Sequence, residues 1–169
     1  ANKALAHGQA LGGGPGPEHC YTTGLCYHYW LTGYESSKLA VLKLADWITN
    51  YHQGDKSLLS QLLSIKEYEL PRIRKIFAKE RISAHRYPFT RGTGNYITAL
   101  LDAFEISSNK DYLTSVEAII HDTLHPSDDI KARDLLNAEI AWSYLILLTS
   151  IIRYINTKLH LQEFDKPFF

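Results

Sequence analysis

Ionisable and aromatic side chains follow a Gly/Pro-rich run near the start of this 169-residue sequence. Glu18, His19 and Tyr21 come directly after the run at residues 12–17, just before an apolar stretch. Gly and Pro disfavour regular structure, so we expect a loop that delivers these side chains to a helix start. Carboxylate, imidazole and phenol groups can transfer protons, and a helix start favours anionic ligands. The alternative interpretation is an ordinary surface loop with a capped helix start.

Two further polar segments, residues 84–96 and 128–139, also precede apolar helical stretches. Their candidate residues are Arg86, Tyr87, Arg91, Asn95, Tyr96, Arg133, Asn137, Glu139 and Trp142. Aromatic faces can stack on sugar rings, and arginine hydrogen-bonds carboxylates in a fixed geometry. If the segments meet, this mixture indicates a saccharide site. The alternative is that Tyr96 and Trp142 belong largely to the core.

The composition is that of an ordinary globular domain, with 45% hydrophobic and 21% charged residues and zero formal net charge. Zero net charge gives no reason to expect a nucleic-acid partner. The most apolar stretch, residues 138–155, contains Glu139 and Arg153, which favours a buried helix over a membrane span. A basic excess between Arg72 and Arg86 is interpreted as a solvated face.

The sequence indicates no metal or cofactor site. Cys20 and Cys26 are expected on one helix, about 120° apart around its axis, and therefore not in a disulfide. His121 and His125 form the one histidine pair at helical spacing, and they lack a third ligand. The sequence contains no Met and begins Ala-Asn-Lys. We therefore expect the chain to be a fragment or carboxy-terminal part of a larger protein. Residues 1–169 are expected to form a single helical domain.

Hydrophobic periodicity predicts an all-α fold built from antiparallel αα-hairpins. Short polar turns join the members of each hairpin, and short turns force neighbouring helices to run antiparallel. The predicted hairpins pair residues 20–32 with 36–51 and residues 94–106 with 110–124. Further helices are predicted at 56–66, after Pro71, and from 138 to about 158.

The two hairpins form a weak internal repeat. A shift of 75 residues aligns Leu25 with Leu100 and Val41 with Val116. Each unit consists of a polar loop, a mostly apolar helix, a turn and an amphipathic helix. An apolar first helix beside an amphipathic second helix predicts two layers, with first helices inside, as part of a solenoid or a closed α/α toroid.

Residues 19–33 (HCYTTGLCYHYWLTG) and 39–48 (LAVLKLADWI) resemble the hairpins of α/α-toroid carbohydrate-active enzymes. In those hairpins an aromatic-rich inner helix ends in Leu-Thr-Gly, and the outer helix ends in an Ala-Asp turn. The groups concerned are the six-hairpin glycosidase-like proteins and the heparinase-like and rhamnogalacturonan-type polysaccharide lyases. The resemblance extends over residues 17–155 and is architectural. Because such toroids have more hairpins than the two found here, it also implies that the chain is a piece of one.

The resemblance implies action on a polysaccharide or oligosaccharide, without a cofactor. Heparinase-like lyases use Asn, His, Tyr and Arg, so Asn95 or Arg91 would neutralise a uronate while His19 and Tyr21 or Tyr96 act as base and acid. Arg86, Tyr87 and Trp142 would complete the substrate-binding set. A glycoside hydrolase instead needs two carboxylates, for which Glu18 and Glu139 are the candidates.

The competing interpretation is a non-catalytic helical-repeat interaction module. Scaffolds of this kind carry short, uniform turns, whereas the approaches here are long and rich in His, Tyr and Arg. For an incomplete ring we expect exposed apolar stripes on the end helices, or self-association. For an enzyme we expect His19, Arg91, Asn95 and Glu139 to face a shared cleft, with Tyr21 and Tyr96 on its walls.

Overall fold

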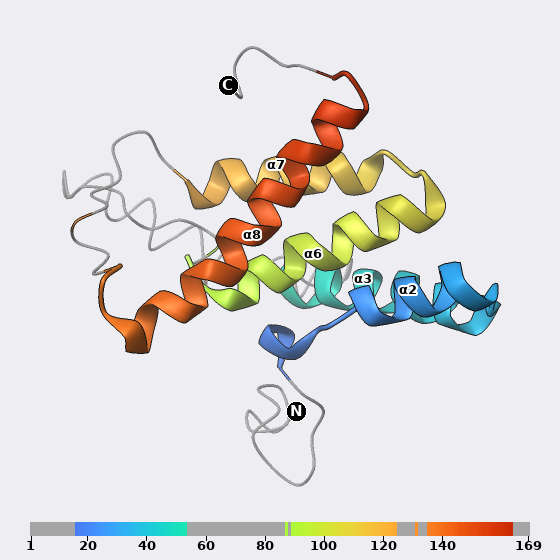
Figure 1. Cartoon of the computed structure of the whole chain (residues 1–169), viewed down its shortest axis with the longest axis horizontal. Coiled ribbons are helices and arrows are strands. Elements are labelled where there is room, and N and C mark those ends of the chain that lie inside the picture. Colours follow the sequence, from blue (N-terminus) through green and yellow to red (C-terminus); the bar gives the residue numbers. More distant parts are fainter. Residues whose placement is uncertain (1–15, 54–86, 88, 125–130, 132–134, 164–169) are drawn as a thin grey trace, which may run out of the picture.

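The structure, a computed structural model, describes residues 16–53, 87, 89–124, 131 and 135–163. Within these ranges every regular element is a helix, which confirms the all-α prediction (Figure 1). The elements are the 3-10 helix η1 (Pro17–His19) and the α-helices α2 (Thr23–Thr32), α3 (Glu35–Gln53), α6 (Arg91–Ser107), α7 (Asp111–Thr123) and α8 (Ala138–His160). The helices predicted at 56–66 and after Pro71 lie outside the described residues.

Both predicted hairpins are present, as α2–α3 and α6–α7, and each first helix ends in a left-handed residue. Gly33 has a φ of 68°, and its N–H donates a 2.7 Å hydrogen bond to the carbonyl of Tyr29. Ser108 has a φ of 58°, and its N–H donates to the carbonyl of Phe104 over 2.7 Å. These residues terminate the helices because a left-handed residue lets its N–H satisfy a late helical carbonyl.

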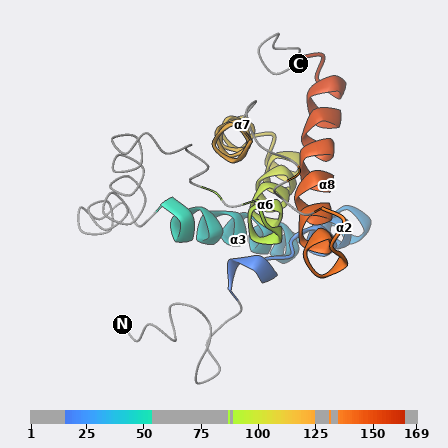
Figure 2. The same cartoon turned by 90° about the vertical axis from the view of Figure 1, so that its left-hand side faces the viewer.

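The core is organised around α6. Helices α2 and α8 lie on one side of α6, and α3 and α7 lie on the other (Figure 2). Ten residues of α6 are buried, whereas α2 buries only Cys26. The core side chains on the two outer helices are Val41, Ala45, Ile48, Leu113, Val116, Ile119 and Ile120. The two-layer prediction placed both first helices, α2 and α6, on the inside. In the structure α6 is central, and α2 is much less buried.

Helix α8 crosses α6 at Gly94. A Cβ atom built on Gly94 would lie 2.8 Å from the backbone N and Cα atoms of Leu147. Any larger residue would therefore separate the two helices at this crossing. Leu147 itself is fully buried, so the two helices are in close backbone contact at this point.

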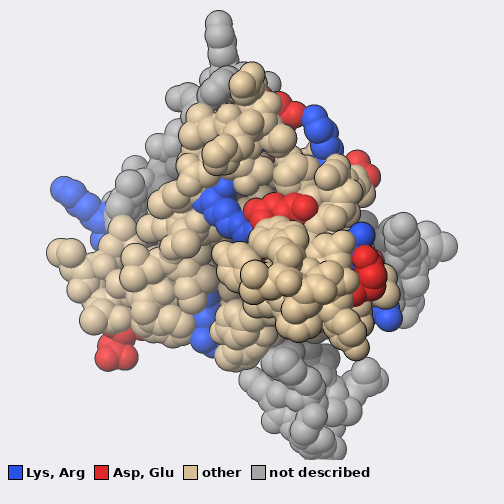
Figure 3. Space-filling view, turned by 45° about the vertical axis from the view of Figure 1, so that its right-hand side comes forward, with Lys and Arg blue, Asp and Glu red and all other residues tan. Residues whose placement is uncertain are grey.

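The prediction that α8 buries most of its surface is wrong. The apolar sequence also favoured packing of this helix against the first helices of both hairpins, α2 and α6. In the structure its main packing contact is with α6, and Leu145 and Ile152 remain 62% and 57% exposed. On α2, Leu31 is 85% exposed. Exposed apolar side chains, as expected on the end helices, are thus present on α2 and α8. Most of the face in Figure 3 is uncharged; basic and acidic side chains meet near its centre, and others lie toward its edges. Among the described helices, none has the length and apolar character needed to cross a membrane.

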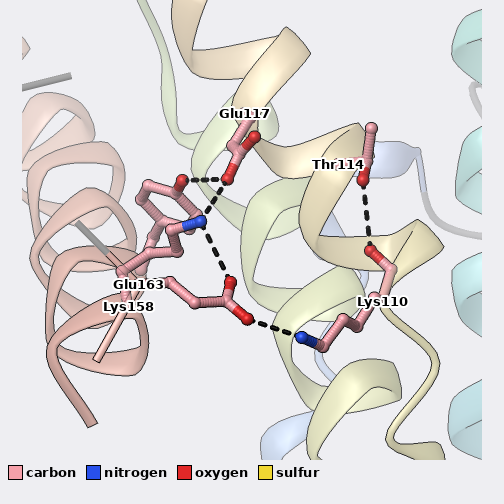
Figure 4. A network of polar contacts seen from close by, with 6 residues as sticks. Lys110, Thr114, Glu117, Lys158 and Glu163 are labelled. Atoms are coloured by element: carbon pink, nitrogen blue, oxygen red, sulfur yellow. Dashed lines mark hydrogen bonds and ion pairs between the residues drawn. The ribbon is translucent and has the colours of Figure 1, made fainter. Parts of the chain in front are cut away.

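A polar network fastens the end of α8 to α7 (Figure 4). Lys158 donates to Glu117 over 2.9 Å and to Glu163 over 3.2 Å, and Lys110 donates to Glu163 over 2.5 Å. The phenol of Tyr154 donates to the same Glu117 oxygen over 2.6 Å. Hydrogen bonds from Lys110 and Lys158 lower the pKa of the Glu163 carboxyl. Burial by itself lowers the pKa of Lys158, but its bonds to Glu117 and Glu163 outweigh this and raise it.

The Glu163→Gln variant should lose stability in a pH-dependent way. A carboxyl whose pKa is lowered on folding contributes stability above its ordinary value of 4.5, and this contribution disappears as the pH falls through the folded-state pKa. Urea unfolding of wild type and variant should therefore differ at about pH 7, and the difference should be smaller at an acidic pH below 4.5, where the Glu163 carboxylate begins to take up a proton. A difference that is equal at both pH values would contradict the role assigned to Glu163.

Candidate functional site

Near its amino end, α6 makes contacts with both η1 and α8 (Figure 1). The side-chain amide of Asn95 donates a 2.6 Å hydrogen bond to the backbone carbonyl of Glu18. The backbone N–H of Arg91 donates to the hydroxyl of Ser143 over 2.9 Å. Helix α6 is thereby joined to η1 through one residue and to α8 through another. The region is called the polar end, and it comprises Glu18, His19, Tyr21, Arg91, Glu139 and Trp142.

The amino-terminal part of the polar end carries three solvent-accessible functional groups. The imidazole Nε2 of His19 lies 3.8 Å from Oε1 of Glu18, and these side chains are 43% and 40% exposed. The ring of Tyr21, a residue that is 61% exposed, lies 6.3 Å from the imidazole in an edge-on arrangement. A base, a carboxylate and a phenol are therefore adjacent at the surface, where a ligand can reach them.

The other part of the polar end is a stacked pair of planar groups. The guanidinium of Arg91 lies over the indole of Trp142, 4.9 Å from the ring centroid. The indole N–H donates to the backbone carbonyl of Glu139 over 2.9 Å, which fixes the ring orientation. Trp142 is 46% exposed, so one flat aromatic surface remains available beside a cation. The side chain of Asn137 accepts from the N–H of Glu139 and caps α8.

Three residues predicted to bind substrate are buried and are not accessible to a ligand. Tyr96 is fully buried and stacks on His52, with ring centroids 4.7 Å apart. Tyr87 is 4% exposed and packs against both rings. Tyr96 therefore belongs to the core and does not form a cleft wall, because the helical period of α6 directs it toward α3. Asn95 is 5% exposed and holds η1 in place. Arg86 and Arg133 lie outside the described residues.

A second cluster of charged residues lies between α6 and α8. We call it the ion cluster, and it consists of Asp102, Glu105 and Arg153. Nη2 of Arg153 lies 2.6 Å from Asp102 and 2.7 Å from Glu105. The Asp102 carboxylate is completely buried, whereas the Arg153 side chain is 27% exposed. A charge removed from water in this way requires a partner, and Arg153 supplies it.

Hydroxyl groups from the start of α2 complete the surroundings of Asp102. Thr22 and Thr23 donate to its Oδ2 atom over 2.5 Å and 2.9 Å, and the Cys26 thiol donates to its backbone carbonyl over 3.7 Å. Burial, reinforced by the Asp102 charge, raises the pKa of Cys20 to about 11 and that of Cys26 to about 12. Both thiols are free and buried, and a raised pKa favours the thiol over the more nucleophilic thiolate at neutral pH.

The ion cluster was not predicted, although two features of the sequence indicate it. Asp102 interrupts a run of buried apolar residues on α6, and Arg153 is the one charged residue between Tyr144 and Ile155. Charged residues inside apolar helical stretches rarely go unpaired. The two positions are 51 residues apart in the sequence, so periodicity within each helix could not pair them.

A shallow cleft of about 390 Å³ opens beside the ion cluster, between α2, α6 and α8. Its lining residues are Thr23, Tyr27, Thr98, Leu145, Ile146, Thr149, Ser150 and Arg153. No residue of the polar end lines this cleft, so the predicted site residues and the cleft are separate features. Within the described part of the chain, no group of three or more His, Cys, Asp or Glu residues is arranged to bind a metal ion; His125 lies outside it.

Comparisons with known proteins give no match: no family model, no curated protein and no solved structure resembles this chain significantly.

Proposed function

We propose that this chain is a section of an α/α-toroid domain that acts on a polysaccharide or oligosaccharide at its polar end. The helix arrangement supports the toroid part of the proposal. The first helices α2 and α6 and the unpaired α8 run in roughly the same direction, while the second helices α3 and α7 lie beyond α6 (Figures 1 and 2). Parallel first helices with returning second helices are what a ring of αα-hairpins requires.

One observation carries the functional part of the proposal: segments that are far apart in the sequence contact each other at the polar end. The Asn95–Glu18 hydrogen bond spans 77 residues, and the Arg91–Ser143 bond spans 52. In a ring of hairpins the segments before the first helices emerge at one end. Such an arrangement would bring the proton-transfer groups and the exposed aromatic face to one surface, which is the mixture that a saccharide site needs.

The polar end contains the groups for uronate elimination. In that reaction a base removes the C5 proton, a C4–C5 double bond forms, and the C4–O bond breaks as an acid protonates the leaving oxygen. His19 would act as the base and Tyr21 as the acid. Arg91, stacked on Trp142, would neutralise the uronate carboxylate. Hydrolysis is the alternative reaction, with Glu18 and Glu139 as the two carboxylates.

The His19→Ala variant tests the proposal. We expect at least about a hundredfold loss of saccharide cleavage, because a positioned acid or base contributes that much or more. The assay uses panels of uronate-containing and neutral oligosaccharides. Loss of unsaturated-product absorbance would identify a lyase, and loss of reducing-end release without such absorbance would identify a hydrolase.

The matched control for this assay is His121→Ala. His121 lies on α7 with its Nδ1 3.8 Å from Asp122, the same separation as in the His19–Glu18 pair, and its side chain is 83% exposed. It should keep full activity. Equal activity of wild type and His19→Ala on every cleaved oligosaccharide would contradict the assignment of His19.

A helical-repeat interaction module is the second candidate. It is favoured by the apolar side chains exposed on α2 and α8, such as Leu31 and Leu145. Sedimentation analysis distinguishes the two candidates when it is combined with the cleavage assay. Concentration-dependent association without any saccharide binding would favour the interaction module.

A further inference from the structure

The cleft between α2, α6 and α8 has a composition unlike that of the polar end. Tyr27, which is 57% exposed, forms an aromatic wall on α2, and Leu145 and Ile146 form an apolar wall on α8. Thr98 and Thr149 add hydroxyl-bearing side chains to the lining. A volume of about 390 Å³ falls within the range of small-molecule sites. The cleft thus combines flat apolar surface with hydroxyl groups.

The positive charge of Arg153 at this cleft is already compensated by carboxylates of the protein. Arg153 is the one charged lining residue, and its guanidinium is held by Asp102 and Glu105. Two carboxylates and one guanidinium sum to a charge of −1. An anionic ligand would therefore have to compete with both carboxylates for Arg153.

Hydroxyl groups of a ligand can still form hydrogen bonds with Arg153 and Thr23. A guanidinium presents five N–H donors, and the contacts of Arg153 with Glu105 and Asp102 use its Nε and Nη2 atoms. Thr23 donates its proton to Asp102, so its oxygen can accept a hydrogen bond from a ligand. Donors and acceptors beside an aromatic face are the complement of a sugar ring, which has an apolar face and a rim of hydroxyls.

We propose that this cleft is a binding subsite for one uncharged pyranose ring, separate from the polar end. This inference rests on the proposed function in taking the ligand to be a saccharide, and it adds that the cleft favours neutral units. A chain bound here would have its neutral residue against Tyr27 and its hydroxyls near Arg153, Thr23 and Thr149.

Calorimetric titration with a neutral tetrasaccharide, cellotetraose, and an acidic one, tetragalacturonate, tests the subsite. Tyr27→Ala should weaken cellotetraose binding at least about tenfold, equivalent to about 1.4 kcal/mol. Thr149→Leu, which fills the cleft and removes a hydroxyl at an exposed position, should have the same effect. Tyr51→Ala is the matched control, because Tyr51 packs on Trp47 of α3 as Tyr27 packs on Trp30 of α2.

The outcomes separate the subsite from the proposed function. Cellotetraose binding that is weakened by Tyr27→Ala and unaffected by Trp142→Ala supports the subsite, whether or not the polar end cleaves saccharides. Binding that depends on Trp142 alone overturns the subsite and leaves the proposed function intact. Tighter binding of tetragalacturonate at Tyr27 overturns the preference for neutral rings, and absence of binding by both sugars overturns the subsite altogether.

Discussion

Replacing Arg153 with methionine should lower the free energy of unfolding by about 3 kcal/mol or more, because it leaves the Asp102 carboxylate buried without a compensating charge. Asp102 is completely inaccessible, and Arg153 is its charged partner at 2.6 Å. Thr22 and Thr23 would still donate to it, but two neutral hydroxyls replace a full positive charge poorly. Urea unfolding of the purified chain measures the loss.

The matched control for Arg153→Met is Lys110→Met, which breaks the ion pair with Glu163 at the surface. The Lys110 side chain is 69% exposed, so its removal should cost no more than about 1 kcal/mol. The double variant Arg153→Met with Asp102→Asn should recover part of the lost stability, since the uncompensated charge is then gone. If Arg153→Met cost no more than Lys110→Met, the ion cluster would not have the structural importance assigned to it.

Gly94→Ala is expected to destabilise the chain by about 2 kcal/mol. Overpacking a close contact typically costs about 1–3 kcal/mol or more, and the new Cβ would meet the Leu147 backbone at 2.8 Å. Alanine would recover up to about 1 kcal/mol through its higher helix propensity, but a backbone cannot move aside as a flexible side chain can. Thermal and urea unfolding both report the net loss.

Gly24→Ala is the control, because we expect this substitution not to destabilise the chain. Gly24 is also helical, and a Cβ there would meet nothing within 4 Å. This substitution should be neutral or stabilising by up to about 1 kcal/mol. Gly94→Ala should therefore be less stable than Gly24→Ala, and a stabilising Gly94→Ala would contradict the close α6–α8 crossing.

The helices and hairpins were predictable because their signals are local. Gly33 marks the end of α2 in the sequence as it does in the structure. The stripe of Val41, Ala45 and Ile48 gives the buried face of α3, and Val116 occupies the equivalent buried position of α7 under the 75-residue shift. Periodicity of this kind specifies which face of an amphipathic helix is buried without any knowledge of its partner.

The position of α8 was not predictable in the same way. This helix is apolar nearly all round, so its sequence does not identify the face that meets α6. The face of α8 that meets α6 depends on Gly94, which lies about 50 residues earlier in the sequence. Because Gly94 has no side chain, the backbone of Leu147 can pack directly against it. The ion cluster follows from the same crossing, because it brings Arg153 to Asp102.

The candidate site likewise contains residues that local sequence features could identify and residues that they could not. Glu18, His19 and Tyr21 were singled out from neighbouring positions, and the structure places their side chains together at the surface. Tyr96 was selected by residue type alone, and its type could not reveal that α3 covers it. The roles of the polar-end residues in binding and cleavage remain predictions.

The most direct test of saccharide binding at the polar end is to follow the three tryptophan indole N–H signals by NMR during oligosaccharide titration. Trp142 belongs to the polar end, Trp30 lies on α2 beside Tyr27, and Trp47 lies on α3 against Tyr51. We expect a saturable shift of the Trp142 signal with a uronate-containing or neutral oligosaccharide, while Trp47 stays unchanged. A Trp142 signal that does not move with any oligosaccharide of either class would contradict it.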